Sequence, residues 1–248
     1  MSVDSPDQLR GLRRAGRVVA ETLHVLRRAV KPGVSTGELD RLAGLSFARH
    51  DARSGPILTY DYPGFVCISV EDEVVHGVPG PRILRPGELV TLDVAAEVGG
   101  YHADAAITVP VGHVDGNRKR LMAATRAALG AGIRAARPGA TLRDVGAAIE
   151  REAARRRFGV LRELTGHGIG LAMHEDPIVF NWPAPAARTR LTPGLVFTIE
   201  PMLTAGRPGV VLDPDGWTVR TIDRAPSAHQ EHTIMVGDSG APVILTAA

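Results

Sequence analysis

The sequence predicts a single α+β domain built from two similar halves. Two pairs of segments match at almost the same offset: residues 29–35 resemble residues 135–141, and residues 86–93 resemble residues 193–200. In the first pair an amphipathic segment runs into Pro-Gly. In the second a Pro-Gly turn runs into an apolar stretch that ends in a carboxylate. Because both matches occur in the same order, at offsets of 106 and 107 residues, they indicate an internal duplication rather than chance.

The same duplication organises the expected helices and strands. Ser35 and Thr141 follow the two Pro-Gly steps at positions that suit a helix N-cap. Apolar periodicity predicts helices over about 8–30, 35–50, 116–136 and 141–158. Alternating and β-branched runs predict strands near 65–70, 74–78, 88–98, 101–109, 161–165, 195–203, 217–222 and 231–236. No linker divides the chain, so we expect one domain, 1–248, with halves at about 10–112 and 116–240.

Composition excludes several classes of protein. The 248 residues are 44% hydrophobic and 23% charged, as in ordinary globular proteins. Lys and Arg number 29 against 27 Asp and Glu, without the basic run that nucleic-acid binding favours, and no apolar run reaches the about 18 residues of a membrane span. Cys67 is the only cysteine, which excludes an internal disulfide and suits a reducing compartment. We therefore expect a cytoplasmic monomer with neither a nucleic-acid nor a membrane partner.

Asp93 and Asp104 are expected on one face of a β-hairpin. The two runs that contain them flank Gly99-Gly100, a typical two-residue turn. With that turn Ala95 faces Asp104, and strand alternation puts Asp93 on the same face, with the two aspartate Cβ atoms about 7–8 Å apart. A carboxylate that follows a buried apolar run needs a partner or a cation, which favours a metal ion over a solvated hairpin face.

Three further candidate ligands, and a second histidine, lie in the second half of the sequence. His167 stands among three alternate glycines in residues 165–170, which would let the backbone pass close to a bulky neighbour, and the alternative is a glycine-rich turn with an incidental histidine. His174 follows seven residues later. Glu200 ends an apolar strand and Glu231 opens another. Four carboxylates and one imidazole form an oxygen-rich set that suits Mn, Fe or Co, with Zn as an alternative. Two ions that share such carboxylates lower the pKa of a water molecule between them toward about 7.

Longer strings resemble type I methionine aminopeptidases, which are peptidases of the pita-bread fold. The resemblance covers about residues 10–236 and is carried by residues 67–69, 74–79, 166–170, 174–177, 197–202, 215–218 and 231–233. It implies a pita-bread fold in which antiparallel sheet encloses a dinuclear metal site. It also implies release of N-terminal methionine from nascent polypeptides, with Co, Mn, Fe or Zn as the divalent ions and transient association with the ribosome.

The resemblance implies a role for each candidate ligand. Asp93 would chelate one ion, and His167 with Glu200 would hold the other. Asp104 and Glu231 would bridge both ions. Glu200 would also accept the proton of the attacking water.

The resemblance further implies two catalytic histidines and a side-chain pocket. His76 would orient the substrate amine and the scissile nitrogen, and His174 would hydrogen-bond the carbonyl or the tetrahedral intermediate. Tyr62, Met173 and Trp217 would bind the first side chain of the substrate. Met173 stands where these enzymes have Phe, so the strictness of the methionine preference is open.

Two other departures concern the same region. A cysteine that these enzymes carry near Tyr60 and Tyr62 is missing, and His229-Gln230 replaces Gln-Tyr ahead of Glu231. Two alternatives therefore stay open beside methionine release. One is an aminopeptidase of the same fold with another N-terminal preference, and the other is a non-catalytic pita-bread binding protein.

Overall fold

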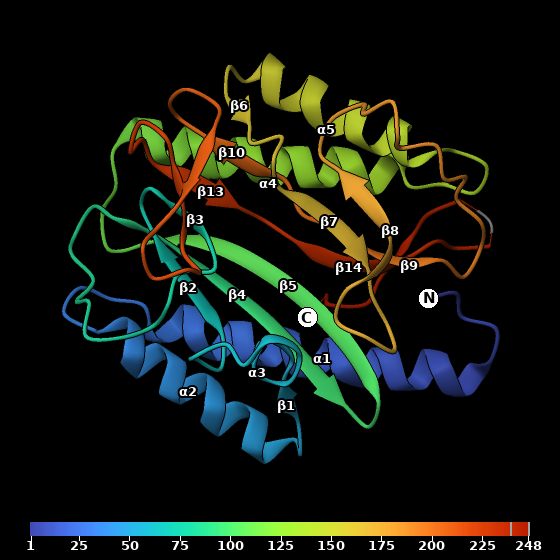
Figure 1. The fold of residues 1–248 in the computed structure, drawn as a ribbon, viewed down its shortest axis with the longest axis horizontal. Helices are drawn as coiled ribbons and strands as arrows, with labels where there is room; N and C mark the ends of the chain where they lie inside the picture. The colour runs from blue at the N-terminus through green and yellow to red at the C-terminus, as the bar shows by residue number, and fades with distance from the viewer. Residues whose placement is uncertain (239, 248) are drawn as a thin grey trace.

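Two helical layers enclose a set of antiparallel sheets (Figure 1). The computed structural model describes residues 1–238 and 240–247. Helices α1 (Pro6–Ala29) and α2 (Thr36–Arg49) form one outer layer, and α4 (Gly116–Ala135) and α5 (Leu142–Arg155) form the other (Figure 1). A short helix, α3 (Gly55–Tyr60), was not expected. Each helical layer covers its own hydrophobic core, so each half of the chain buries apolar surface independently.

The duplicated Pro-Gly steps end in matching helix caps. Ser35 Oγ accepts a hydrogen bond of 3.1 Å from the Glu38 amide, and the Glu38 carboxylate accepts one of 2.7 Å from the Ser35 amide. Thr141 and Asp144 form the same capping box at the start of α5. The two predicted N-caps are confirmed, and a cap of this kind stabilises a helix by about 1 kcal/mol.

The central hairpin has the predicted register. Strands β4 (Leu89–Val98) and β5 (Tyr101–Pro110) pair with Ala95 opposite Asp104. Gly99 and Gly100 have φ values of 59° and 88°, which the tight turn of a hairpin requires. β4 also pairs with β1 (Arg53–Ser54) and β2 (Cys67–Val70), so its carboxylate-bearing segment lies inside a sheet.

The second half contributes most of the remaining strands. A five-stranded sheet has the order β15-β14-β9-β7-β8, with bounds Val243–Ile244, His232–Met235, Val196–Ile199, Thr165–Gly168 and Glu175–Phe180. A three-stranded sheet joins β13 (Ser227–His229), β10 (Met202–Thr204) and β6 (Gly159–Val160). Another joins β11 (Val210–Leu212), β12 (Val219–Thr221) and β3 (Glu73–Val75), and so contains strands of both halves.

The two halves meet along β5. The Asp104 amide donates to Thr233 Oγ1 at 2.9 Å, and that hydroxyl donates to the Asp104 carbonyl at 2.7 Å. The Glu231 amide donates to the Ala106 carbonyl at 2.8 Å. These bonds fix Asp104 of one half beside Glu231 of the other. Carboxylates that are 127 residues apart in sequence therefore share one place in the fold.

The strand expected near residues 161–165 lies further along the chain, as β7, which contains Gly166 and Gly168 and excludes the glycine-rich turn that was the alternative there. A Cβ on Gly166 would lie 2.8 Å from the Thr198 carbonyl oxygen, and one on Gly168 would lie 2.1 Å from that of Asp176. The glycines thus permit neighbouring backbone to pack closely against the strand. Strands β1, β6, β8, β11, β13 and β15 were not expected, and the single strand expected over 195–203 is divided into β9 and β10.

Candidate metal centre

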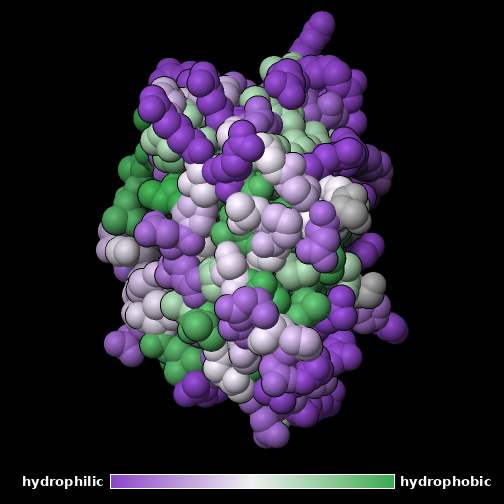
Figure 2. Space-filling view, turned by 90° about the vertical axis from the view of Figure 1, so that its right-hand side faces the viewer, coloured by the Kyte–Doolittle hydropathy of each residue, from purple (hydrophilic) through white to green (hydrophobic). Residues whose placement is uncertain are grey.

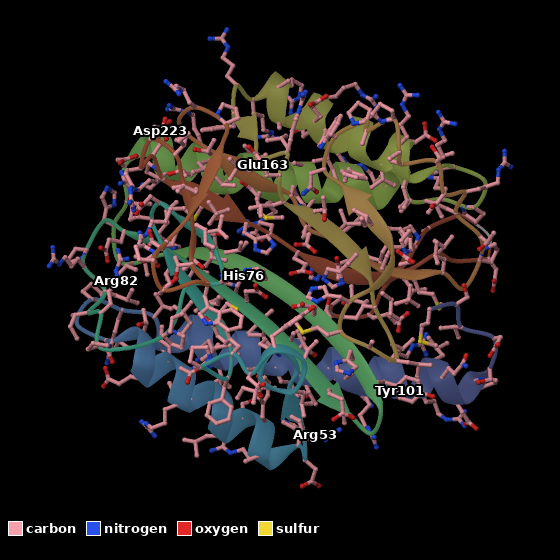
Figure 3. All side chains as sticks on the ribbon, viewed as in Figure 1. Arg53, His76, Arg82, Tyr101, Glu163 and Asp223 are labelled. Atoms are coloured by element: carbon pink, nitrogen blue, oxygen red, sulfur yellow. The ribbon has the colours of Figure 1, made fainter. Side chains whose placement is uncertain are left out.

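All the candidate residues line a single cavity of about 440 Å³ between the two halves. The walls include the five expected ligands, Asp93, Asp104, His167, Glu200 and Glu231. They also include the expected catalytic and substrate-binding residues His76, His174, Tyr62, Met173 and Trp217. Figure 3 shows His76 near the middle of the molecule, between the helical layers. On the surface, polar side chains gather along the upper and lower edges of the face shown in Figure 2.

Asp93 and Asp104 project from neighbouring strands of the hairpin toward each other. Their side chains are close enough to share a hydrogen bond, and this contact requires a proton when no cation is present. Burial raises the pKa of Asp104 to about 6. Burial and the neighbouring charge of Asp104 raise the pKa of Asp93 well above its ordinary value. The hairpin thus holds two acidic groups in a place where water does not stabilise both charges.

Glu200 and Glu231 add two further carboxylates from the second half. Glu200 follows β9 and accepts a hydrogen bond of 2.7 Å from Thr198 Oγ1, yet burial still raises its pKa to about 8. Glu231 is only 2% exposed, and burial, with the charges of Asp104 and Glu200, raises its pKa well above the ordinary range. Within the described part of the chain, no lysine or arginine lines the cavity.

The donor set fits a divalent cation. Asp104 Oδ1 and Glu231 Oε1 are buried without a hydrogen-bond partner among the described residues. Ligand atoms of Asp104, His167 and Glu231 all lie within 4.8 Å of one another. Unpaired buried oxygens that converge in this way are strongly destabilising unless a cation satisfies them. A hard or borderline metal ion is the partner that such oxygens and an imidazole select.

His167 is prepared to bind a metal through one ring nitrogen. Its Nδ1 donates to the Gly168 carbonyl at 2.9 Å, so the lone pair of the neutral ring is on Nε2. Nε2 lies 3.6 Å from Glu200 Oε1, on the side of the carboxylates. Burial, followed by the nearby His174, lowers the pKa of His167 to about 3, so the ring stays neutral at physiological pH.

The two expected catalytic histidines stand at the rim of this cluster. The rings of His167 and His174 are 4.0 Å apart between centroids. Tyr60 hydrogen-bonds His174 Nδ1 through its hydroxyl, and burial lowers the pKa of His174. His76 has a φ of 57°, an uncommon backbone conformation for a residue other than glycine, and one that occurs often at functional sites.

The expected side-chain pocket is also assembled in this cavity. The Tyr62 hydroxyl donates to the Gly77 carbonyl at 2.7 Å, and its ring meets Trp217 edge to face at 5.2 Å between centroids. Met173 and Cys67 are buried beside them in the lining. The pocket is therefore aromatic and sulfur-rich, and suits an unbranched apolar side chain.

No role for Cys67 or His229 follows from the sequence. Cys67 lies opposite Asp93 in the β2–β4 pairing. The contact of Tyr60 with His174 depends on how the halves meet, whereas His229 reaches Glu200 within the second half, through the pairing of β13 with β10.

Comparison with known proteins agrees with this geometry. The model of metallopeptidase family M24 matches residues 10–238. The chain therefore belongs to metallopeptidase family M24, whose members bind divalent metal ions. Methionine aminopeptidase 1 of Bacillus subtilis is 40% identical over 244 residues, which are 97% of each chain. Methionine aminopeptidase of Escherichia coli is 39% identical over 246 residues, 98% of this chain and 93% of the other.

Solved structures of methionine aminopeptidases have the same fold as this chain. Methionine aminopeptidase from Rickettsia prowazekii superposes with a TM-score of 0.95 at 36% identity, and that from Thermotoga maritima with 0.96 at 34%, each over the whole of both chains. Prolidase from Pyrococcus furiosus has a TM-score of 0.80 at 18% identity and shares the fold alone, since this chain covers 65% of it. The predicted α+β pita-bread fold is confirmed.

Proposed function

We propose that this chain is a metal-dependent aminopeptidase that removes the N-terminal methionine from nascent polypeptides. The observation that carries the proposal is the buried cluster of four carboxylates and one neutral imidazole inside a cavity that also holds an apolar pocket. Relatives named methionine aminopeptidase, 39–43% identical over nearly the whole chain, support the same substrate. A non-catalytic binding protein would have no need for a complete set of buried metal ligands.

Each donor has a proposed metal-binding role. Asp93 would hold one divalent ion, and His167 with Glu200 would hold the other. Asp104 and Glu231, which lie where the halves meet, would serve both ions. When bound, the ions supply Lewis-acid chemistry and a nucleophile derived from water near neutral pH. The ions are Co, Mn, Fe or Zn, and we propose that two of them bind.

Glu200 is the proposed proton acceptor. Its carboxylate is buried beside the other ligands, and the Thr198 hydroxyl fixes one of its oxygens at 2.7 Å. Among the described residues, no side-chain hydroxyl bonds the second oxygen, which can take a proton from water and pass it on to the leaving amine. Burial raises the carboxyl pKa to about 8 in the metal-free protein, and a bound cation would lower it, so that the group is ionised and able to accept a proton.

His174 and His76 are proposed to bind the peptide around the scissile bond. When the Tyr60 hydroxyl donates to His174 Nδ1, the proton of the neutral ring is on Nε2. That N–H can donate to the carbonyl oxygen as negative charge develops on it. His76 lies in the same cavity lining and would orient the scissile nitrogen.

The first side chain of the substrate is proposed to enter the pocket of Tyr62, Met173 and Trp217. A linear thioether fits this lining, whereas a charged side chain would lose hydration without gaining a partner. Because Met173 is flexible, a second candidate function, an aminopeptidase with broader N-terminal preference, follows from the same pocket.

The partners are then N-termini of nascent chains, with transient ribosome association. A cytoplasmic monomer suits this role, and within the described residues no helix combines the length and apolar character needed to cross a bilayer.

Peptide turnover tests the proposal. The protein is stripped of metal, reloaded with Mn or Co, and given Met-Gly, Ala-Gly, Leu-Gly and Ala-Pro tetrapeptides side by side. Metal-dependent release of methionine alone is expected. Release of a different residue would support the second candidate, and no release from any peptide would contradict an aminopeptidase function.

A further inference from the structure

His229 is a fully buried histidine inside the metal centre, and none of the roles above uses it. It ends strand β13 and is 1% exposed. Its amide donates to Thr108 Oγ1 at 2.8 Å, and that hydroxyl donates back to the His229 carbonyl at 2.8 Å. Strand pairing with Met202 adds a second restraint. The backbone of this residue is therefore held from two sides, which fixes the place of its ring.

The ring of His229 has no hydrogen-bond partner on either nitrogen within the described part of the chain. Two unpaired nitrogens in a site that excludes water are unfavourable by about 1–3 kcal/mol each unless something else satisfies them. The charged atoms that it approaches are carboxylate oxygens: Nε2 lies 3.7 Å from Glu231 Oε2 and 3.9 Å from Glu200 Oε2. These distances are too long for hydrogen bonds.

The same distances suit three ligands of one ion. Nitrogen and oxygen ligands lie about 2.0–2.2 Å from a divalent transition metal, so the ligand atoms around it are separated by roughly 3–4 Å. Donor atoms of Glu200, His229 and Glu231 all lie within 4.8 Å of one another. His167 approaches the other oxygen of Glu200 at 3.6 Å. Glu200 thus has an imidazole beside each of its oxygens, and the two approaches are alike.

We propose that His229 is a sixth protein ligand of the metal centre, which binds through Nε2 the ion that Glu200 and Glu231 hold. This proposal rests on the proposed function in one respect, which is that the cluster binds divalent metal ions. A second imidazole makes the donor set less oxygen-rich, and this favours borderline ions such as Co, Fe or Zn over Mn. His229→Gln removes the imidazole and keeps a polar side chain of similar reach, so it is the matched variant.

Proton NMR of the cobalt-loaded protein in water counts the coordinated imidazoles directly. Each imidazole bound to Co(II) gives an exchangeable N–H signal far outside the ordinary spectral range. Two such signals are expected, from His167 and His229, and each disappears in the matching Gln variant. His102→Gln serves as a matched control, because His102 is buried outside the ligand cluster, and both signals should remain in it.

Metal affinity gives a second readout that does not involve turnover. His229→Gln is expected to weaken Co(II) binding about 10- to 100-fold, with a smaller change for Mn(II), so the Co/Mn preference falls. One signal in the unsubstituted cobalt protein, or two signals in His229→Gln, would overturn the proposal. The count in the unsubstituted protein decides the question even where a variant does not fold.

The same sample separates this proposal from the proposed function. Two signals without peptide turnover would uphold His229 as a ligand and contradict the aminopeptidase. Peptide turnover with only one N–H signal would uphold the aminopeptidase and contradict His229 as a ligand. Failure of the unsubstituted protein to take up cobalt would overturn both.

Discussion

Binding of a divalent metal is expected to release protons from this protein. The centre gathers four carboxylates from two halves of the chain, and no lysine or arginine lines it in the described residues. Without a cation, these groups reduce their mutual repulsion by holding protons. A metal ion replaces the protons, so affinity and proton release are linked.

The size of the effect follows from the individual groups. At pH 7 Glu200, with a pKa raised to about 8 by burial, is protonated in about nine molecules of ten. Asp104, at about 6, is protonated in about one of ten. Burial and neighbouring charges raise the pKa of Asp93 and Glu231 well above the ordinary range, so each adds up to one proton. His167 is already neutral and adds none. The release is therefore about one to three protons.

Titration calorimetry in buffers of different ionisation enthalpy measures this number as the slope of observed enthalpy against buffer enthalpy. Affinity should rise about tenfold per pH unit for each proton released. Glu200→Gln is the matched variant, and it should lower the slope at pH 7 by about one proton per protein. A slope of zero at pH 7 would refute the assignment of these carboxylates to the metal centre.

The remaining predictions concern stability and individual side chains. Burial raises the pKa of Glu200 in the folded protein to about 8. The contribution of this group to the stability of the metal-free protein is therefore full below its ordinary pKa and is lost as pH rises through about 8. The increase in Tm on adding metal should grow from pH 5 to 8, and an increase that does not change with pH would contradict this. His76→Ala should keep metal and lose about 100-fold or more in kcat, whereas Asp104→Ala should also lose metal; equal metal loss would refute that division. Gly146→Ala should destabilise by about 1–3 kcal/mol in urea unfolding, because its Cβ would lie 2.3 Å from the Trp182 carbonyl, while Gly130→Ala should not destabilise.

The hairpin could be predicted from sequence because its determinants are local. Alternation fixes which side chains share a face, and Gly99-Gly100 fixes the turn, so the opposition of Ala95 and Asp104 follows without any knowledge of the rest of the chain. The helix caps at Ser35 and Thr141 were predictable for the same reason.

Contacts between the halves could not be derived in this way. The contact between Asp104 and Glu231 depends on hydrogen bonds between strands far apart in sequence, so the residues alone indicate a shared oxygen-rich ligand set but not this contact. The alternate glycines of β7 indicate close packing, but the sequence does not identify Thr198 and Asp176 as the neighbours or fix the bounds of the strand. The place of His229 depends on β13, a strand of three residues that has no periodicity to detect.

Anomalous diffraction from crystals grown with cobalt and methionine shows where the metal and the substrate side chain bind. Cobalt peaks are expected among Asp93, Asp104, His167, Glu200 and Glu231. Methionine is expected in the same cavity with its side chain against Tyr62 and Trp217. Cobalt bound elsewhere, or methionine bound outside this cavity, would contradict this assignment of the metal centre and the side-chain pocket.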